Sequence, residues 1–543
     1  MLSRQFPENS LFASAAKRIE QGDFSGACEI IARAESTEKS NPENQHLCAI
    51  LYSQARQFEL ARHAVYRAIS LEPGESIFWR NLNYFFHAEG LLDKSLTPAE
   101  RAVRVEPKVA DNLFRAGLTA LNTENPAVAL KFFEKTILLS PQYAGAHLNL
   151  GVAKNHLLDE AAATTHYQRE TIVSPREAAG FYNLGNVSLL QGRFEEAIES
   201  YDRAAHLGLN SADAKVTRAL AYLVLGRFNP GWQLYESRFV SPAYLKTLPR
   251  DPRLVTTRPA FAPSRDTDSR VLVWGEQGVG DEVMFGSMLG EFRGHCGRML
   301  VQMDKRLIPL FRRSLPSDVE FYERGTVVPE DRYDSHIPIG SLGLRLRPNR
   351  ESFEGHRGAY LKADEDWVRS LRASFGLAEG ERLIGVSWRS SNPETGAGRS
   401  LPLWELAQVL GAEGRRLVNL QYGEVQAEIT EALERAGVVV EQVPGLDCQN
   451  DLDGLAALIG ACDEVVSIGN ATAHLAGALG QKTTVLLPVP GMRSIHNRAN
   501  PGWRWLASGD ESPWYKNMVV LRNTTVDTWV PLLTQLKTRF ALD

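Results

Sequence analysis

Cysteine is scarce in this chain, and no two of its cysteines have the spacing of a metal-binding motif. The five are Cys28, Cys48, Cys296, Cys448 and Cys462. An odd, scattered set does not make a disulfide framework, so it favours reduced thiols in a cytoplasm over an extracellular fold. Cysteine usage therefore excludes the disulfide-stapled and zinc-ribbon classes of protein.

Long hydrophobic runs are also missing. No window approaches the ~18 apolar residues that a membrane-spanning helix needs, and the N-terminus lacks the apolar core of a signal peptide. We therefore expect a cytoplasmic protein without a membrane span. Positive charge is not in excess either, because the net charge is −5, which argues against nucleic acid as the main partner.

A third absence is that of a metal-nucleotide motif. Asp-x-Asp occurs at 266–268, 364–366 and 451–453, but none of the three follows an apolar strand, as such a site would require. We therefore predict no metal and no other cofactor. What remains is an ordinary composition, with 43% hydrophobic and 23% charged residues, over 543 residues. That length is too great for a single core and predicts two to four domains.

Prolines mark a repeat in the first half of the chain. Pro73, Pro107, Pro141 and Pro175 stand 34 residues apart, a period typical of the tetratricopeptide repeat, in which helix–turn–helix units stack on one another. Small and aromatic residues keep the same step: Ala61, Ala129, Ala163 and Ala197, then Phe133, Tyr167 and Tyr201. With weaker units at both ends, about six repeats are expected between residues 1 and 240.

One position of the repeat is not of a packing type. Asn81, Asn149 and Asn183 share it, whereas Arg115 interrupts the series. An amide offers a donor and an acceptor, so a row of asparagines on the concave surface can hold an extended peptide backbone. We predict an acceptor-peptide groove at these three residues. The alternative is that the asparagines cap or bridge neighbouring helices.

The pattern changes after a proline-rich stretch at 241–268, which we interpret as a linker. A short apolar strand, Val271 to Trp274, is followed by the glycine turn of 275–280, Asp281 and a helix-like segment. This order is the opening of a doubly wound α/β domain, expected over 269–375. The turn does not fit G-x-G-x-x-G, so it does not predict a dinucleotide site.

A second α/β block is expected over 376–543, with strands near 383–388, 417–421, 464–468 and 484–487. The turn after the third strand, Gly469 to His474, opens a helix. Small residues there expose backbone N–H groups at the positive end of the helix dipole, which favours a diphosphate. Two facing α/β domains describe the GT-B glycosyltransferase architecture.

Three segments carry a resemblance to a known family: EQGVGDEVMFGSML, SIGNATAHLAGALGQKTTVLLP and WRWLASGDESPWY. They resemble bacterial tetratricopeptide-repeat glycosyltransferases, whose catalytic half is similar to heptosyltransferases of family 9 and whose layout is similar to O-linked N-acetylglucosamine transferase. The resemblance covers nearly the whole chain. It implies an all-α repeat superhelix followed by a GT-B fold of two Rossmann-like domains.

The resemblance also assigns roles. It makes Asp281 a candidate catalytic base, although capping of its own helix explains that aspartate equally well. Relatives often carry Ser-Val-Asp-Thr where this chain has Ser467-Ile468-Gly469-Asn470, so a carboxylate is missing at Gly469. The first α/β domain is also shorter than in lipopolysaccharide heptosyltransferases, which implies a different acceptor.

For the nucleotide-sugar donor we predict a site made by the helix start and by side chains from neighbouring loops. The predicted donor-binding residues are Arg389, Arg399, Gln421, Asn470, Ala471, Thr472, Ala473 and His474. The arginines would pair with phosphate oxygens. Each role has an alternative without a ligand. Arg389 is then a surface arginine, Arg399 lies in a solvated loop, and His474 is a structural histidine at the helix start.

Two further segments are open to interpretation. The aromatics Trp503, Trp505, Trp514 and Tyr515 belong either to the cleft or to a core cluster that holds down the C-terminal segment. The last stretch, Val526 to Phe540, has helical apolar spacing, and we expect it to cross back to the first α/β domain.

The leading hypothesis is a cytoplasmic protein O-glycosyltransferase, metal-independent and inverting, whose repeats hold the acceptor polypeptide. The resemblance implies flagellin as one acceptor and a CMP-activated nonulosonic sugar as one donor. Two alternatives stay open. One is transfer to a glycan or lipid-linked acceptor, and the other is a repeat adaptor whose transferase half has lost catalysis.

Overall fold

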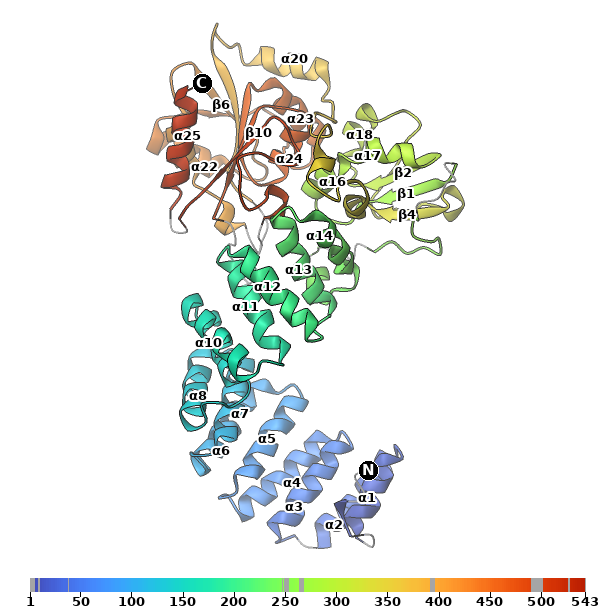
Figure 1. The fold of residues 1–543 in the computed structure, drawn as a ribbon, viewed down its shortest axis with the longest axis vertical. Helices are drawn as coiled ribbons and strands as arrows, with labels where there is room; N and C mark the ends of the chain where they lie inside the picture. The colour runs from blue at the N-terminus through green and yellow to red at the C-terminus, as the bar shows by residue number, and fades with distance from the viewer. Residues whose placement is uncertain are drawn as a thin grey trace. The chain divides into compact units, whose positions relative to one another are not determined.

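The computed structural model describes residues 5–7, 10–37, 39–246, 248, 253–262, 268–390, 396–489, 502–525 and 528–542. The chain divides into two compact units, Met1–Val187 and Ser188–Asp543 (Figure 1). Each unit has its own buried core. The two units are described one after the other.

The first unit is all-α and consists of helices that pack as antiparallel neighbours along the chain. Its helices are α1 Leu11–Glu20, α2 Phe24–Thr37, α3 Pro42–Gln54, α4 Phe58–Leu71, α5 Ser76–Ala88, α6 Leu96–Val105, α7 Ala110–Asn122, α8 Pro126–Leu139, α9 Ala146–His156 and α10 Glu160–Val173. Helix α11, Ala178–Leu190, spans the boundary between the units. Several helices begin at side-chain caps, as where Ser10 accepts a hydrogen bond from Ala13 N.

The 34-residue period has a direct structural meaning. Each of the four prolines stands two residues after the second helix of a pair, behind α4, α6, α8 and α10, where it cannot continue the helix. The small residue of the first helix faces the aromatic residue of the second. A Cβ at Gly117 would lie 2.5 Å from Phe133, and one at Gly151 would lie 2.6 Å from Tyr167. Glycine is therefore required for the helices to approach this closely, and the repeat prediction is confirmed.

The second unit begins with repeat helices and continues into the α/β region. Its first helices are α12 Phe194–His206, α13 Ala212–Val224, α14 Phe228–Tyr235, the 3₁₀ turn η3 Glu236–Val240 and α15 Pro242–Leu245. We expected the repeat domain to end at residue 240, and repeat-like helices do reach Tyr235. The compact unit nevertheless starts inside α11, because α13 and α14 pack on the α/β core. The indole of Trp232, for instance, donates to the Arg347 carbonyl at 2.8 Å.

The first sheet has four parallel strands in the order β3-β2-β1-β4. They are β1 Arg270–Trp274, β2 Arg298–Met303, β3 Glu320–Glu323 and β4 Ser335–Pro338. The helices of this region are α16 Val279–Gly286, α17 Leu289–Phe292, α18 Ile308–Ser314 and α19 Leu342–Leu346. Strand β1 is almost wholly buried, as its continuous apolar sequence predicts for a central parallel strand.

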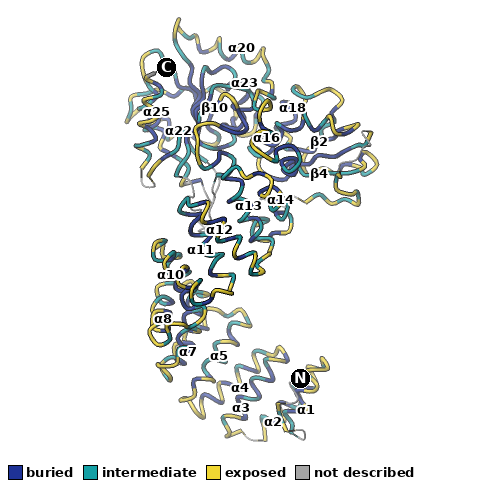
Figure 2. The backbone as a smooth tube through the Cα atoms, viewed as in Figure 1, coloured by how far each residue is buried: buried dark blue, intermediate teal, exposed yellow. Residues whose placement is uncertain are grey.

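The second sheet has six parallel strands in the order β10-β9-β8-β5-β6-β7. They are β5 Arg382–Ser387, β6 Arg415–Asn419, β7 Val440–Glu441, β8 Glu464–Ile468, β9 Thr483–Leu487 and β10 Met518–Arg522. Its helices are α20 Glu365–Ser374, α21 Leu403–Leu410, α22 Gln426–Ala436, α23 Leu452–Ala461, α24 Ala471–Ala478 and α25 Val530–Leu542. Figure 2 shows strands of both sheets as mostly buried backbone, whereas the helices α20, α22 and α25 are more exposed.

The C-terminal helix differs from expectation. Leu532, Leu536 and Phe540 of α25 are buried in one apolar cluster with strands β5 and β8 and with α21. The helix therefore covers its own six-stranded sheet, and the prediction that it crosses back to the first α/β domain is wrong. The start of that predicted segment, Val526, lies outside the described residues. An apolar stripe cannot tell which of two sheets it will cover.

The fold is an all-α tetratricopeptide-repeat region followed by an α/β region with two parallel sheets. Over the described ranges, no helix is both long enough and apolar enough to cross a bilayer.

Candidate active site

Two helix starts, one from each α/β sheet region, meet in the second unit. Helix α16 follows β1, helix α24 follows β8, and the two helices pack against each other. The approach is close, since a Cβ at Gly280 would lie 3.2 Å from His474 Cδ2 and 3.4 Å from Ala471 Cα. The positive ends of two helix dipoles therefore converge on one region, and no phosphate group fits between Gly280 and Ala471.

Sheet topology marks the same region. Strand order reverses between β1 and β4 in the first sheet and between β5 and β8 in the second. Ligands of open α/β sheets bind at the carboxyl ends of the strands beside such a reversal. Asp281 follows β1, Arg389 follows β5 and Asn470 follows β8, so these three predicted residues stand at the switch points.

Asp281 is held by an arginine. The Nε of Arg504 donates to Asp281 Oδ1 at 2.5 Å, and both side chains are half-buried. The capping alternative for Asp281 does not apply, because Gly278 is the N-cap of α16 and Asp281 stands three positions further on, without a side-chain cap. Its carboxylate oxygen Oδ1 instead accepts the hydrogen bond from Arg504. Oδ2 makes no hydrogen bond to any described residue.

A second cation lies near this pair. Arg399 ends the 3₁₀ turn Ala397–Arg399 and makes no ion pair with any described residue. Burial and, to a smaller extent, the Arg504 cation together lower the pKa of Arg399 to about 10, with a partial opposing effect from the Asp281 carboxylate. Burial also disfavours charge on Arg504, but Asp281 beside it raises the pKa of Arg504 overall. Asp281 thus pairs with Arg504 alone, and the unpaired Arg399 beside them leaves positive charge for an anionic ligand.

His474 is buried against the same pair of charges. Its ring stacks on Trp505, with centroids 4.6 Å apart. Burial, with a smaller contribution from the Arg504 cation and a partial opposing effect from Asp281, lowers the pKa of His474 to about 3. The imidazole is therefore neutral at physiological pH.

A chain of hydroxyl groups fixes which nitrogen of His474 carries the proton. Tyr360 donates its only hydroxyl proton to the Val283 carbonyl at 2.5 Å, so Tyr515 must be the donor in the hydrogen bond between Tyr515 and Tyr360. Tyr515 then accepts from His474, whose Nδ1 lies 3.0 Å away. His474 is thus the Nδ1–H tautomer, and Nε2 keeps a lone pair. It accepts a hydrogen bond rather than donating one to phosphate.

The start of α24 is partly occupied. Asn470 Oδ1 accepts from Ala473 N at 3.3 Å and from Ser467 Oγ at 3.0 Å, while Asn470 Nδ2 donates to Ser387 Oγ at 2.8 Å. Asn470 therefore caps the helix and ties β8 to β5. The backbone N–H groups of Ala473 and His474 are engaged, with His474 N weakly bonded to Asn470 O at 3.4 Å. Those of the first two residues have no partner among the described residues.

Thr472 and Gly469 complete this turn. Thr472 is buried, and its Oγ1 has no hydrogen-bond partner in the described part of the chain. At Gly469 a Cβ would lie 2.8 Å from both Trp505 Nε1 and Leu487 Cδ2. A carboxylate side chain has no room at this position, because Trp505 and Leu487 fill the space.

Arg389 and Gln421 have local partners. The Arg389 guanidinium pairs with Glu428 at 3.0 Å and donates to the Glu424 carbonyl. Gln421 Oε1 accepts from Ser387 Oγ, Trp388 N and Arg389 N at 2.9–3.0 Å. Gln421 thus positions the end of β5. In this structure neither of these two side chains contacts Asp281 or His474, whereas Arg399 lies near Asp281 and Arg504.

Three residues that carry the site escaped sequence reasoning. Arg504 lies between Trp503 and Trp505, and only the two tryptophans were considered as site residues. An arginine inside an apolar aromatic segment indicates that a charged partner lies nearby. Glu282 is fully buried, and burial raises its pKa to about 7 despite an ion pair with Arg324 at 2.8 Å. The sequence around Asp281 did not indicate that the adjacent Glu282 is buried. Tyr360 could not be found without the fold.

The aromatic cluster is a core. Trp503, Trp505, Trp514 and Tyr515 are all buried. Trp503 packs edge-on against Trp232, with centroids 5.4 Å apart. The core interpretation of these residues is the correct one, and Trp505 additionally touches His474.

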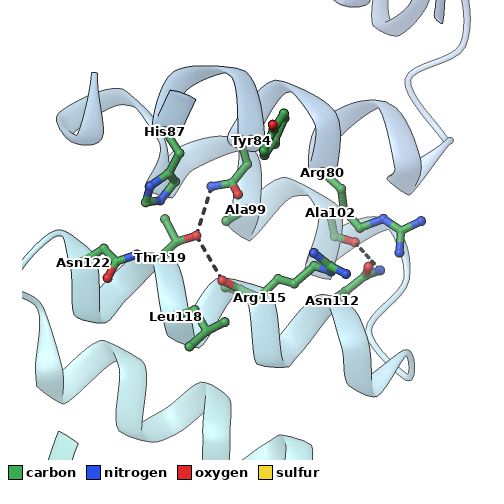
Figure 3. A pocket seen from close by; sticks show the side chains of 12 residues that line it. Arg80, Tyr84, His87, Ala99, Ala102, Asn112, Arg115, Leu118, Thr119 and Asn122 are labelled. Carbon is green, nitrogen blue, oxygen red and sulfur yellow. Dashed lines mark hydrogen bonds between the residues drawn. The ribbon is translucent and has the colours of Figure 1, made fainter. Parts of the chain in front are cut away.

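The predicted asparagine row lies in the first unit and is half-buried. Asn81 Nδ2 lies 2.5 Å from His46 Nε2, and Asn149 Nδ2 donates to the Gly145 carbonyl at 2.8 Å. The Asn81 amide therefore links α5 to α3, and the Asn149 amide bonds back to the start of its own helix. The peptide groove at these residues stays a prediction. Asn183 has no side-chain partner among the described residues. A small pocket lies beside Arg115, the residue that interrupts the row (Figure 3).

No group of three or more His, Cys, Asp or Glu side chains within the described ranges could hold a metal ion.

Comparisons with known proteins agree with the repeat half. The tetratricopeptide-repeat family matches residues 178–208. Protein FlbA of Caulobacter vibrioides is 29% identical over 457 residues, which cover 80% of this chain and 68% of FlbA. This chain therefore contains tetratricopeptide repeats and is similar to FlbA over most of its length.

Solved structures are also similar over part of the chain. YrrB, described as a TPR protein with an unusual peptide-binding site, has 19% identity and a TM-score of 0.30, and the match covers 33% of this chain and 93% of YrrB. MamA has 17% identity and a TM-score of 0.28, with 30% and 95% covered. Likeness at this level carries no argument about function.

Proposed function

We propose that this protein is a GT-B type O-glycosyltransferase that moves a sugar from a nucleotide-sugar donor to a polypeptide held by its repeats. The observation that carries the proposal is the meeting of α16 and α24, which brings Asp281, Arg504, Arg399 and His474 into one region. Each group has a use in sugar transfer. An acceptor hydroxyl must lose a proton as it attacks the anomeric carbon, and a departing phosphate needs its charge stabilised.

Asp281 is the proposed base. Its Oδ2 is available to an acceptor hydroxyl while Arg504 fixes the carboxylate through Oδ1. Arg399 and Arg504 supply positive charge for the leaving phosphate without a metal, together with the free N–H groups at the start of α24. The Nε2 lone pair of His474 accepts a hydrogen bond from a sugar or ribose hydroxyl. Single-displacement attack by the hydroxyl inverts the anomeric centre.

The acceptor and donor are proposed more narrowly from the family resemblance. Flagellin and a CMP-activated nonulosonic sugar are the first pair to test in a transfer assay on the full chain. A glycan or lipid-linked acceptor is the alternative for the same site.

A thermal-shift panel of UDP, GDP, ADP, dTDP and CMP, each with its sugar forms, tests the proposal. A ligand present at about 100 times its dissociation constant stabilises the protein that binds it by roughly 2.7 kcal/mol. One clear nucleotide hit supports a transferase, and no shift with any member on folded protein contradicts it.

Asp281→Asn is the matching test of mechanism. We expect the variant to keep the nucleotide-dependent thermal shift and to lose sugar transfer by about 10²–10⁴-fold, the usual contribution of a general base. Glu354→Gln is the control, since this carboxylate is exposed in the same region of the chain. Full transfer by Asp281→Asn would remove the aspartate from the chemistry.

A repeat adaptor without catalysis is the second candidate, and one observation favours it. The Asp281–Arg504 ion pair and the tight contact of Gly280 with Ala471 close the region between the helix starts. Such an adaptor would bind its protein partner but no nucleotide, so the same thermal-shift panel separates the two candidates.

A further inference from the structure

The turn between β1 and α16 contains three glycines, and packing requires two of them. A Cβ at Gly275 would overlap Glu282 Oε1. One at Gly280 would lie 3.2 Å from His474 Cδ2. Gly278 is different, because no such overlap excludes a side chain there and its φ of −78° suits any residue. Neither packing nor backbone conformation therefore explains the glycine at 278.

Helix stability alone would favour a different residue at this position. Gly278 is the N-cap of α16 and offers no side-chain cap. Serine, asparagine or aspartate would accept a hydrogen bond from a backbone N–H group of the first turn and so stabilise the helix. The chain forgoes this bond, which points to another constraint on residue 278.

The space that a side chain would take at Gly278 lies beside the proposed base. A Cβ there would be 3.7 Å from Asp281 Oδ2, and apart from chain neighbours no other heavy atom of the described residues would lie within 4 Å of it. Oδ2 is the oxygen that the hydrogen bond from Arg504 leaves unused. Gly278 is exposed and the Asp281 side chain is 16% exposed, so this opening is reached from solvent.

Hydrogen bonds on both sides hold the opening in place. The Gln277 carbonyl accepts from Arg324 Nη1, and Gln277 Oε1 accepts from the Tyr235 hydroxyl at 3.2 Å. On the other side Arg504 fixes the carboxylate of Asp281. Gln277 Nε2 is buried and has no hydrogen-bond partner in the described part of the chain. This donor needs a partner that the described residues do not supply.

We propose that Gly278 is a specificity-determining residue, over whose bare Cα the acceptor polypeptide brings a serine or threonine hydroxyl to Asp281 Oδ2. Such a hydroxyl lies close to its own backbone, so the acceptor backbone must come near the base, and glycine permits this close approach. The hydroxyl proton then passes to Oδ2 as the oxygen bonds to the anomeric carbon. The sugar–phosphate bond breaks, and its electron pair leaves with the phosphate. This inference rests on the proposed function and adds the path of the acceptor.

Gly278→Ala and Gly278→Val place a methyl and an isopropyl group in this space. Both are assayed in the full chain with flagellin and the CMP-activated nonulosonic sugar. We expect Gly278→Val to lose transfer by about 10²-fold, as when a reacting group is misplaced, and Gly278→Ala to fall in between. Both should keep the wild-type thermal shift with the nucleotide sugar. Gly278→Ala should also keep donor hydrolysis, because water is small enough to pass the methyl group.

Carboxyl labelling tests the same path without any sugar transfer. A carbodiimide with glycine ethyl ester converts accessible carboxylates to amides, which peptide mass spectrometry locates. Asp281 should be labelled in the wild-type chain. Gly278→Val should lose most of this label and Gly278→Ala part of it, whereas the exposed Glu354 should be labelled equally in all of them.

Gly294→Ala and Gly294→Val are the matched controls, because Gly294 is exposed, with open space around its Cβ and an ordinary φ. They should keep both transfer and the label on Asp281. An unlabelled Asp281 in the wild-type chain, labelling that survives Gly278→Val, or wild-type transfer by that variant would each overturn the proposal. If Gly278→Val does not fold, undiminished transfer and labelling in Gly278→Ala would overturn it.

The two readouts separate this proposal from the function on which it rests. Loss of the Asp281 label in Gly278→Val, with no transfer by the wild-type chain, would support the path to the carboxylate and contradict the transferase. Transfer that depends on Asp281 but not on Gly278 would support the transferase and overturn the path.

Discussion

The helix pairs of the first unit and the last pair, α13 and α14, are built from the same repeat but serve different cores. In the first unit, consensus glycines and aromatics such as Gly151 and Tyr167 pack helix against helix. In the last pair, Trp232 and Tyr235 are buried against the aromatic core of the α/β region. The final repeat has therefore lost much of the consensus because its surface serves another domain.

A buried ion pair connects the last repeat to the α/β region and has no equivalent role in the packing of the first unit described above. Arg238, directly after α14, is fully buried and donates to both carboxylate oxygens of Glu276, at 2.8 Å and 2.6 Å. Glu276 also accepts from Gly340 N at 3.0 Å. Glu276 stands in the turn that leads to Asp281. The last repeat thus fixes the loop that carries the proposed base.

Removing that arginine should have the largest effect. Arg238→Ala leaves the Glu276 carboxylate buried without its counter-ion, which costs about 3–5 kcal/mol. We expect the second unit to unfold at much lower denaturant concentration while the first unit is unaffected, as followed by hydrogen exchange of peptides from each unit. Equal loss of protection in both units would show that the cores are not separate.

A repeat glycine of the first unit should behave in the opposite way. In Gly117→Val the new side chain overlaps the fully buried ring of Phe133, so we expect a loss of roughly 1–3 kcal/mol. Hydrogen exchange should report the loss in peptides of α7 and α8, with the second unit unchanged. A valine control needs a glycine with open space around its Cβ and a negative φ, which excludes Gly355 because its φ is positive. Gly294, which has both open space and an ordinary φ, is the matched control site.

His474 should make the stability of the second unit depend on pH. Its pKa is lowered to about 3 in the folded chain from an ordinary value near 6.5. Between these values the unfolded chain binds the extra proton, so the second unit loses stability as pH falls through this window, by at most about 1.4 kcal/mol per pH unit. Denaturant unfolding at several pH values should show this slope, and His474→Gln should lack it.

Nitrogen-15 spectra of His474 provide the independent check. The hydroxyl chain predicts the Nδ1–H tautomer, with no titration near pH 6.5. A protonated Nε2, or a pKa close to the ordinary value, would contradict both the tautomer and the slope.

The smallest effect is expected at Arg115. Its side chain is 60% exposed, so Arg115→Gln should change the stability of the first unit by less than about 0.5 kcal/mol, as surface substitutions usually do. Thermal unfolding should find it within that range of Arg104→Gln, which removes the same charge from an exposed arginine on α6. A large loss would mean that the ion pair between Arg115 and Asp111 is needed for the first unit to fold.

Much of the fold could be predicted from periodicity. The 34-residue step located the ends of α4, α6, α8 and α10 through their prolines, and short apolar runs located strands such as β1 and β8. The destination of α25 could not be predicted, because its apolar stripe fits either sheet.

The site was predictable only in part. Asp281 and His474 were accessible because small residues at strand-to-helix turns signal a ligand site. Arg504 was not, because its partner Asp281 lies far away in sequence. The local partners of Arg389 and Gln421 escaped for the same reason, since only the folded chain shows which carboxylates and amides compete for a side chain.

Hydrogen exchange of the full chain with each nucleotide of the thermal-shift panel tests the central claim most directly. If the second unit holds a transferase site where α16 and α24 meet, one nucleotide should slow exchange in peptides from 278–286 and 471–478 and leave the repeats of the first unit unchanged. Protection of neither segment by any nucleotide would contradict the claim.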